Sequence, residues 1–162
     1  ILEALKEKLS EKNLGGVVAS NFAIGAVMLM HFSQLASKYF DSAEIIESHH
    51  DKKVDAPSGT ALTTAEKMRN YRGSDFINNI PEITHIENTR GGLLGGIPIH
   101  SIRLPGLVAH QEVIFGSEGQ TFSLRHDSTG LDSFMPGVLM SIREVMKHGT
   151  FFNGLDSLFG LK

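Results

Sequence analysis

The N-terminal part of the chain alternates between apolar and charged positions at helical spacing. Over residues 1–14 this pattern predicts an amphipathic helix that ends near Asn13, where a glycine pair follows. The short apolar run of residues 16–20 comes next and is typical of a buried strand. A helix, a glycine turn and a buried strand in this order indicate the last unit of an α/β domain whose earlier units are absent. We therefore expect residues 1–20 to be the remnant of a larger domain.

The next part of the chain predicts two longer helices that flank a strand. Residues 21–40 have an apolar stripe and a polar face at helical spacing. Residues 44–50 are typical of a strand, and a charged loop separates them from a second helix over residues 59–72. Ser58 precedes that helix and suits the N-cap position, because its hydroxyl can accept a hydrogen bond from a first-turn amide.

Beyond Gly73 the period of the apolar positions changes from helical to alternating, which predicts strands. The predicted strands cover residues 82–88, 97–103, 108–115 and 120–127. The turn Gly116-Ser-Glu-Gly119 joins the last two strands as a hairpin, and a final helix is predicted over residues 133–147. The glycine-rich run of residues 91–96 precedes no helix, so we interpret it as a loop. Together these elements predict an α+β fold in which a mixed, largely antiparallel sheet is backed by helices.

Composition narrows the function without identifying it. The 162 residues carry a formal net charge of −3, which is too small to favour nucleic acid or an acidic membrane surface as a partner. The chain has no cysteine, so disulfides, thiolate nucleophiles and cysteine-bound metals are excluded. Its longest apolar run, from Phe22 to Met30, is far shorter than the roughly 20 residues that cross a bilayer. We expect a cytoplasmic protein that binds neither a membrane nor nucleic acid.

Candidate chemistry is concentrated between Glu47 and Thr60. His49 and His50 are adjacent at the end of a predicted strand, so their side chains should point to opposite faces and cannot readily chelate one metal. We expect no metal site. Instead, one histidine should face a cleft as a proton donor while the other makes a supporting hydrogen bond. Lys53 lies in the following loop and can bring a positive charge to the same cleft.

The start of the helix after this loop is a candidate anion site. Its first-turn amides and the positive end of its dipole attract negative charge, and Gly59 permits a close approach of a ligand to the backbone. With a histidine and Lys53, these groups describe a pocket for a small anion such as a carboxylate. A solvated loop followed by an ordinary serine cap explains the same residues, and spacing alone leaves both interpretations open. Ser58 is not expected to be a hydrolytic nucleophile, because the Gly-x-Ser-x-Gly turn is missing.

A resemblance to a known family favours the anion site. The run His49-His50-Asp-Lys-Lys53-Val-Asp55-Ala-Pro-Ser-Gly-Thr60-Ala61 resembles the signature of the dihydrodipicolinate reductases. Residues 20–25, 102–115 and 124–128 and the last predicted helix are similar to further segments of that family, so the likeness extends from Gly16 onward. One segment departs from the pattern: many members have Gly-Glu-His-Thr where this chain has Ala109-His-Gln-Glu112. Glu112 is therefore given no role by analogy.

The resemblance implies a role for each matching residue. His49 would be the general acid that protonates the substrate as a hydride arrives, and Lys53 would be the second catalytic group. Arg103 would be a further contact to a substrate carboxylate, with an ordinary surface ion pair as the alternative. The other residues that would bind the substrate's carboxylates are His50, Ser58, Gly59 and Thr60. The nicotinamide end of the cofactor would contact Ala19, Ser20, Asn21 and Phe22.

As a whole, the resemblance implies the NAD(P)H-dependent reduction of a dicarboxylate, 4-hydroxy-tetrahydrodipicolinate, to tetrahydrodipicolinate in lysine and diaminopimelate synthesis. It also implies three parts. Residues 1–20 would be a remnant of the dinucleotide-binding (Rossmann) domain, residues 21–148 would bind substrate and form a homotetramer, and residues 149–162 would return to the cofactor domain. No Gly-x-Gly-x-x-Gly turn occurs between a strand and a helix, so the chain alone is expected to be inactive. The alternative is a non-catalytic module whose sheet only forms an oligomer.

Overall fold

The computed structural model describes residues 1–147 and 149–161. The chain forms two compact units: Leu29–Gly130 is one, and Ile1–Met28 together with Leu131–Lys162 is the other. Each unit has its own sheet. Among the described residues no helix is both long and apolar enough to cross a membrane.

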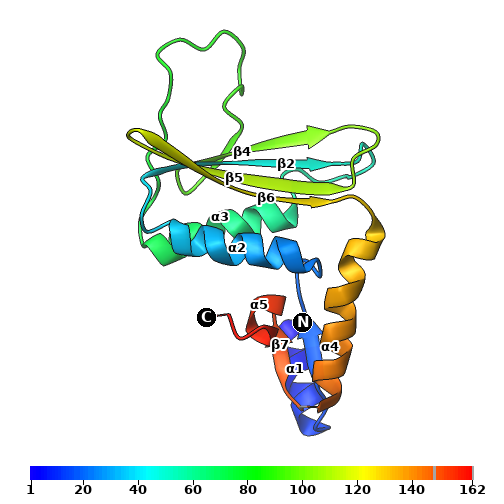
Figure 1. Cartoon of the computed structure of the whole chain (residues 1–162). Helices are drawn as coiled ribbons and strands as arrows, with labels where there is room; N and C mark the ends of the chain where they lie inside the picture. Colours follow the sequence, from blue (N-terminus) through cyan, green and yellow to red (C-terminus); the bar gives the residue numbers. More distant parts are fainter. Residues whose placement is uncertain (148, 162) are drawn as a thin grey trace. The chain divides into compact units, whose positions relative to one another are not determined.

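The larger unit is built on a five-stranded mixed sheet with the strand order β3-β4-β2-β5-β6. Its strands are β2 (Ser42–His49), β3 (Gly92–Leu94), β4 (Ile97–Arg103), β5 (Ala109–Ser117) and β6 (Gln120–Ser128). The central strand β2 runs parallel to β4 and antiparallel to β5, and the remaining pairs are antiparallel. Helices α2 (Ile24–Ala36) and α3 (Gly59–Arg72) lie on one face of this sheet (Figure 1). This arrangement confirms the predicted α+β fold, in which helices back a mixed sheet.

Alternation along β2 decides which of its side chains enter the core. Ala43 and Ile45 are buried beside Phe115 and Val113, which are their partners on β5. Fully burying one large apolar side chain stabilises a fold by about 1.5–3 kcal/mol. Glu47 continues the same inward row and is also completely buried, so a carboxylate lies where the pattern predicts an apolar residue. The neighbouring elements complete this core with Ala61, Ala65, Met68, Ile97 and Ile99.

Among the described residues of the larger unit, no helix covers the opposite face of the sheet (Figure 1). Apolar and charged side chains are mixed on it. Leu93 and Ile102, which lie on this face, are 61% and 39% exposed. Arg125 on β6 forms ion pairs with Glu112 on β5 and with Asp127 on its own strand. A large contiguous apolar patch on such a face would be typical of a contact with another protein chain.

The segment between α3 and β3 is irregular, so the predicted strand over residues 82–88 is wrong. The isoleucines of this segment, such as Ile83 and Ile86, are 70–71% exposed. The edge of β4 that such a strand would need is occupied by β3, which lies in the glycine-rich run interpreted as a loop. Gly95 and Gly96 form the two-residue turn between β3 and β4 with φ of 58° and 79°, a conformation that favours glycine. The hairpin therefore depends on its turn rather than on apolar alternation.

Most other predicted elements are confirmed, with some of their ends shifted. α3 begins and ends at the predicted residues, whereas α2 is shorter at both ends than residues 21–40. Ser58 is the N-cap of α3, because its hydroxyl accepts a hydrogen bond from the amide of Ala61 at 3.2 Å. Gly73 ends the helix in a left-handed conformation, with φ of 82°. These caps place the start of α3 at the end of the loop that follows β2.

The smaller unit contains a two-stranded parallel sheet, in which β1 (Gly16–Val18) pairs with β7 (Phe151–Asn153). Its helical elements are α1 (Leu2–Glu11), the 3-10 turn Leu131–Phe134, α4 (Met135–Lys147) and α5 (Leu155–Leu158). Gly137 of α4 packs against the backbone carbonyl of Phe22, where a Cβ atom would clash. The two ends of the chain thus belong to one unit. The predicted boundary at His148 and the last residue, Lys162, lie outside the described residues, and the three-part functional division stays a prediction.

Candidate functional site

The end of β2 brings the candidate catalytic residues to the start of α3. Glu47 and His49 lie two residues apart on one strand, so their side chains share the face that α3 covers. His50 follows the strand and is exposed, and its carbonyl accepts a hydrogen bond from the amide of Lys53 at 3.2 Å. All of these residues belong to the larger unit. Within residues 1–147 and 149–161, no three histidine, aspartate or glutamate side chains are grouped closely enough to hold a metal ion.

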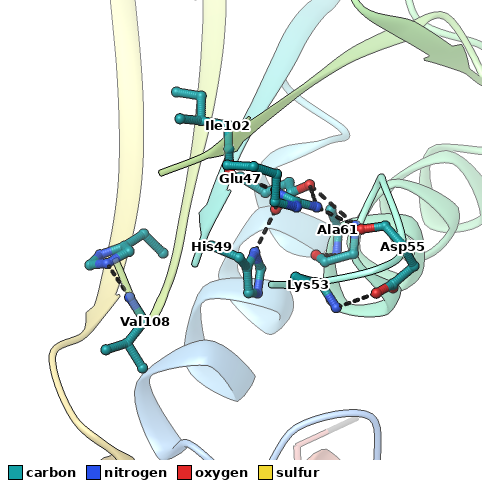
Figure 2. A network of polar contacts seen from close by, with 10 residues as sticks. Glu47, His49, Lys53, Asp55, Ala61, Ile102 and Val108 are labelled. Carbon is teal, nitrogen blue, oxygen red and sulfur yellow. Dashed lines mark hydrogen bonds and ion pairs between the residues drawn. The ribbon is translucent and has the colours of Figure 1, made fainter. Parts of the chain in front are cut away.

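The buried carboxylate of Glu47 is the centre of a polar network (Figure 2). Its Oε2 atom lies 2.6 Å from Nδ1 of His49 and accepts a hydrogen bond from Arg103 at 3.0 Å. Its Oε1 atom accepts a second hydrogen bond from Arg103 at 2.7 Å and one from the amide of Ser58 at 3.3 Å. A buried charge is tolerated only when it is paired and hydrogen-bonded. The network meets that requirement with donors from β2, β4 and the start of α3.

Glu47 remains ionised in this environment. Burial by itself raises the pKa of Glu47, but hydrogen bonds from Arg103, Ser101 and His49 outweigh it, so its pKa lies below the ordinary value. The hydrogen bond to His49 therefore runs from the ring to the carboxylate, because an ionised carboxylate can only accept. Nδ1 of His49 carries a hydrogen, and Nε2 is the ring nitrogen outside this contact.

The pKa of His49 lies below the ordinary value for histidine. Burial is the largest cause, and the positive charges of Lys53 and Arg103 lower the pKa further, while Glu47 partly offsets both. His49 is thus mostly neutral at pH 7. A bound anion would raise this pKa, because negative charge next to the ring stabilises its protonated form. A dianionic ligand next to the ring would therefore favour the protonated form of His49.

Lys53 extends the positive charge of the site into the loop. Its ammonium group donates a hydrogen bond to Oδ1 of Asp55 at 2.7 Å (Figure 2). That hydrogen bond lowers the pKa of the Asp55 carboxyl. Because the carboxylate of Asp55 is 54% exposed, a ligand carboxylate can compete with it for the same ammonium group.

The start of α3 has the geometry of an anion site. The side chain of Ser58, the N-cap, accepts a hydrogen bond from the amide of Ala61. The amides of Gly59 and Thr60 come before that of Ala61 in the first turn. A Cβ atom added at Gly59 would meet no other atom within 4 Å, so there is open space beside this backbone. Open space, a helix dipole and the nearby Lys53 together suit a small carboxylate ligand.

Arg103 is the last residue of β4 and pairs with Glu47. Its partner Glu47 is completely buried, so the two do not form an ordinary surface ion pair. The guanidinium also donates to the backbone carbonyl of Asp55 at 2.9 Å and to that of Ile102 at 2.7 Å. Its contact to a substrate carboxylate stays a prediction, and its observed contacts connect β4 to the loop that carries Lys53.

Sequence reasoning missed Glu47 as a functional residue. The available signal was an acidic residue in the inward row of an apolar strand, two positions before a candidate catalytic histidine. A cavity of about 500 Å³ lies nearby, lined by Ala56, Pro57, Asn88, Gly91, Gly92, Ile99, His100 and Ser101. Neither His49 nor Lys53 lines this cavity. The candidate site is therefore the open surface at the end of β2 rather than the cavity.

The predicted nicotinamide contacts lie in the smaller unit. Residues 19–22 follow the carboxyl end of β1, and β1 is parallel to β7. Dinucleotides bind at the carboxyl ends of parallel strands, so the position of this segment fits a nicotinamide cofactor. Ser20 is exposed, while the side-chain oxygen of Asn21 accepts a hydrogen bond from the amide of Ala23 at 2.8 Å and shapes the turn before α2.

Fold and site together define a class: an α+β domain in which a histidine, a lysine and a helix N-terminus lie at the end of the central strand of a mixed sheet. Comparison with known proteins identifies the family within that class. Residues 25–158 match the family described as dihydrodipicolinate reductase, C-terminus, and the chain belongs to this family.

Individual relatives agree with this assignment. The chain is 50% identical over 157 residues to the 4-hydroxy-tetrahydrodipicolinate reductase of Bacillus velezensis, and 50% identical over 154 residues to that of Halalkalibacterium halodurans. The alignments cover 97% and 95% of this chain. They cover 59% and 58% of the relatives, so the chain spans about three fifths of their length.

A solved structure has the same fold. The dipicolinate-bound dihydrodipicolinate reductase of a Paenisporosarcina species is 49% identical to this chain, with a TM-score of 0.85. The superposition covers 96% of this chain and 59% of that structure. These comparisons confirm the resemblance read from the signature at the end of β2.

Proposed function

We propose that this chain is the substrate-binding part of a 4-hydroxy-tetrahydrodipicolinate reductase, an NAD(P)H-dependent oxidoreductase of lysine and diaminopimelate synthesis. The observation that carries the proposal is the position of His49, Lys53 and the N-terminus of α3 around one surface of the larger unit. Because the chain belongs to the reductase family, we assign the substrate of that family to these groups. Because such a reductase draws on the reduced nicotinamide pool, we propose the cytoplasm as its location.

The ligand of the site is a planar or nearly planar dicarboxylate in this proposal. Lys53 and the first-turn amides at Gly59 and Thr60 would bind one carboxylate by charge and by hydrogen bonds. His50 and the Ser58 cap region would contact the ligand at the edges of this site. The related Paenisporosarcina structure is described as dipicolinate-bound, which supports a ligand of this chemistry.

The chemistry assigned to the chain's own residues is proton transfer and charge stabilisation. NAD(P)H, when bound, supplies the hydride, and residues 19–22 are the part of this chain that would hold its nicotinamide end. His49 gives a proton from Nε2, and the hydroxyl group of the substrate leaves as water, so hydride and proton together balance the reduction. Lys53 stabilises the negative charge of the bound dicarboxylate throughout the reaction.

A homotetramer is the second part of the proposal. The uncovered face of the sheet, with Leu93 and Ile102 exposed, is a surface that a second copy of the chain would bury. Its ion pairs, including that between His110 and Asp127 at 2.7 Å, would lie within the same contact. This face also supports the alternative function, a module that only forms an oligomer and does not bind a substrate.

Binding of pyridine-2,6-dicarboxylate separates the two functions. Calorimetry should detect saturable binding of this compound to the chain, and pyridine-2-carboxylate is the matched control that lacks one carboxylate. We expect the control to bind at least tenfold more weakly, which corresponds to a difference of about 1.4 kcal/mol. If neither compound binds while the chain still oligomerises, the oligomerisation module is the better function.

A further inference from the structure

We infer that Glu47 is a positioning residue of the proposed reaction: it holds His49 with Nε2 toward the substrate and connects this ring to the anion-binding start of α3. The inference rests on the proposed function. Glu47 itself is 0% exposed and touches no bulk solvent, so it acts through its partners rather than on the substrate. Its role follows from the way in which its donors divide between its two oxygens.

His49, Arg103 and Ser58 donate to Glu47 on both of its oxygens. Oε2 faces His49 and one nitrogen of Arg103, and Oε1 faces the other terminal nitrogen of Arg103 and the amide of Ser58. The hydrogen bonds and the positive charge of Arg103 keep the pKa of Glu47 below its ordinary value, so the carboxylate is ionised and can only accept. His49 must then donate from Nδ1, and the tautomer of the neutral ring is determined by this geometry.

The same carboxylate joins the three elements that carry the site. His49 is on β2, Ser58 begins α3, and Arg103 comes from β4, where its partner in the parallel register is His49. Arg103 also donates to the carbonyl of Asp55 in the loop that carries Lys53. His49 and the cap residue of α3 therefore contact Glu47 directly, and the loop that carries Lys53 is connected to Glu47 through Arg103 by two hydrogen bonds.

A structural ion pair need not involve a residue proposed for catalysis. The chain contains such a pair for comparison, because Glu44 on the opposite face of β2 is bound by Arg90 and lies 2.8 Å from Nε2 of His100. Glu44 and Glu47 thus have the same types of partner on the same strand. Only Glu47 has a partner among the residues proposed for catalysis, so Glu44 is a matched control.

Substitution of Glu47 needs a design that preserves the fold. Glu47→Gln would turn an amide NH₂ toward two donors in either orientation, and breaking one side of a buried ion pair is usually strongly destabilising. The combined replacement Glu47→Leu and Arg103→Met removes both charges and keeps similar volumes, which proteins often tolerate. This double variant removes the hydrogen bond to Nδ1 of His49 without leaving a buried unpaired charge.

The first measurement is made on the chain itself and does not depend on catalysis. Nitrogen NMR of the His49 ring distinguishes a protonated from an unprotonated ring nitrogen. In the wild-type chain above the pKa of His49, we expect the hydrogen on Nδ1. In the double variant we expect a shift toward the Nε2–H tautomer, and in Glu44→Gln we expect no change. A wild-type ring with its hydrogen on Nε2 would overturn the inference.

The second measurement uses the intact reductase with its dinucleotide-binding domain. The double variant should lower kcat by roughly 10–100-fold, the usual effect of removing a residue that orients a functional histidine. The Kd of pyridine-2,6-dicarboxylate should change less than kcat, and the pH profile of kcat/KM should shift. Glu44→Gln should stay within about twofold of wild type.

The outcomes of the two measurements separate the two hypotheses. An inactive wild-type enzyme contradicts the proposed function, whereas an active wild type with an equally active double variant contradicts only the role of Glu47. If the double variant does not fold, the tautomer of His49 in the wild-type chain still tests the role of Glu47.

Discussion

Gly59→Ala should leave the chain at least as stable as the wild type and at the same time make it a weaker binder of dicarboxylates. The added methyl group would meet no atom within 4 Å in the ligand-free chain, so it causes no steric strain. Gly59 is the first residue of α3, and alanine is favoured over glycine in a helix by roughly 0.5–1 kcal/mol. The free energy of unfolding should therefore stay the same or rise by up to about 1 kcal/mol.

Affinity should change in the opposite direction. The methyl group would fill the open space through which a carboxylate reaches the first-turn amides. Losing one hydrogen bond to a charged ligand costs about 1.5–3 kcal/mol, which corresponds to a roughly 10- to 100-fold increase in Kd. Urea unfolding measures the first effect, and calorimetry with pyridine-2,6-dicarboxylate measures the second.

Gly116→Ala is the matched control for this experiment. Gly116 lies in β5, has no positive φ, and also has nothing within 4 Å of an added Cβ atom. Its substitution should leave the Kd of the dicarboxylate within twofold of wild type. If Gly59→Ala also leaves the Kd within twofold, the carboxylate does not bind at the start of α3, and the proposed site is wrong.

Four other predictions address catalysis, pH, assembly and the cofactor. In the intact reductase, His49→Ala should lower kcat by roughly 10²–10⁴-fold, and Lys53→Ala should lower both kcat and substrate affinity; near-normal steady-state kinetics for both variants would exclude them as the catalytic pair. The pKa of Glu47 is lower in the folded chain than its ordinary value in the unfolded chain. The ionised Glu47 therefore stabilises the fold at any pH above the ordinary pKa, and this stabilisation is lost as the pH falls through the folded-state pKa. Acid unfolding followed by circular dichroism should therefore depend less steeply on pH in the variant with Glu47→Leu and Arg103→Met, and equal slopes would contradict the shifted pKa. Light scattering at micromolar concentration should give a tetramer mass for the chain, and a clean monomer mass would rule out the proposed assembly. Calorimetry of this chain with NADH should show no binding up to millimolar concentration, since most dinucleotide affinity comes from pyrophosphate and ribose contacts on a glycine-rich turn. Tight binding of NADH would mean that the cofactor site is not where we propose it.

Local patterns in the sequence determined much of this fold and part of its site. α3 was predicted from its first to its last residue, because its serine cap and its terminal glycine are signals within the segment itself. The hairpin of β5 and β6 followed from alternation and a glycine turn. The signature from His49 to Ala61 identified the family, and it did so because its residues are contiguous in the chain.

The tertiary structure decided which distant residues meet. Glu47 and Arg103 are 56 positions apart, and they pair because β2 and β4 are parallel neighbours in a register that places His49 beside Arg103. Similarly, β3 rather than residues 82–88 occupies the edge of β4, because a glycine pair permits the tight turn. Apolar periodicity shows that a strand is buried on one face, but it contains no information on which strand lies beside it. The partner of the candidate catalytic histidine therefore became visible only in the folded sheet.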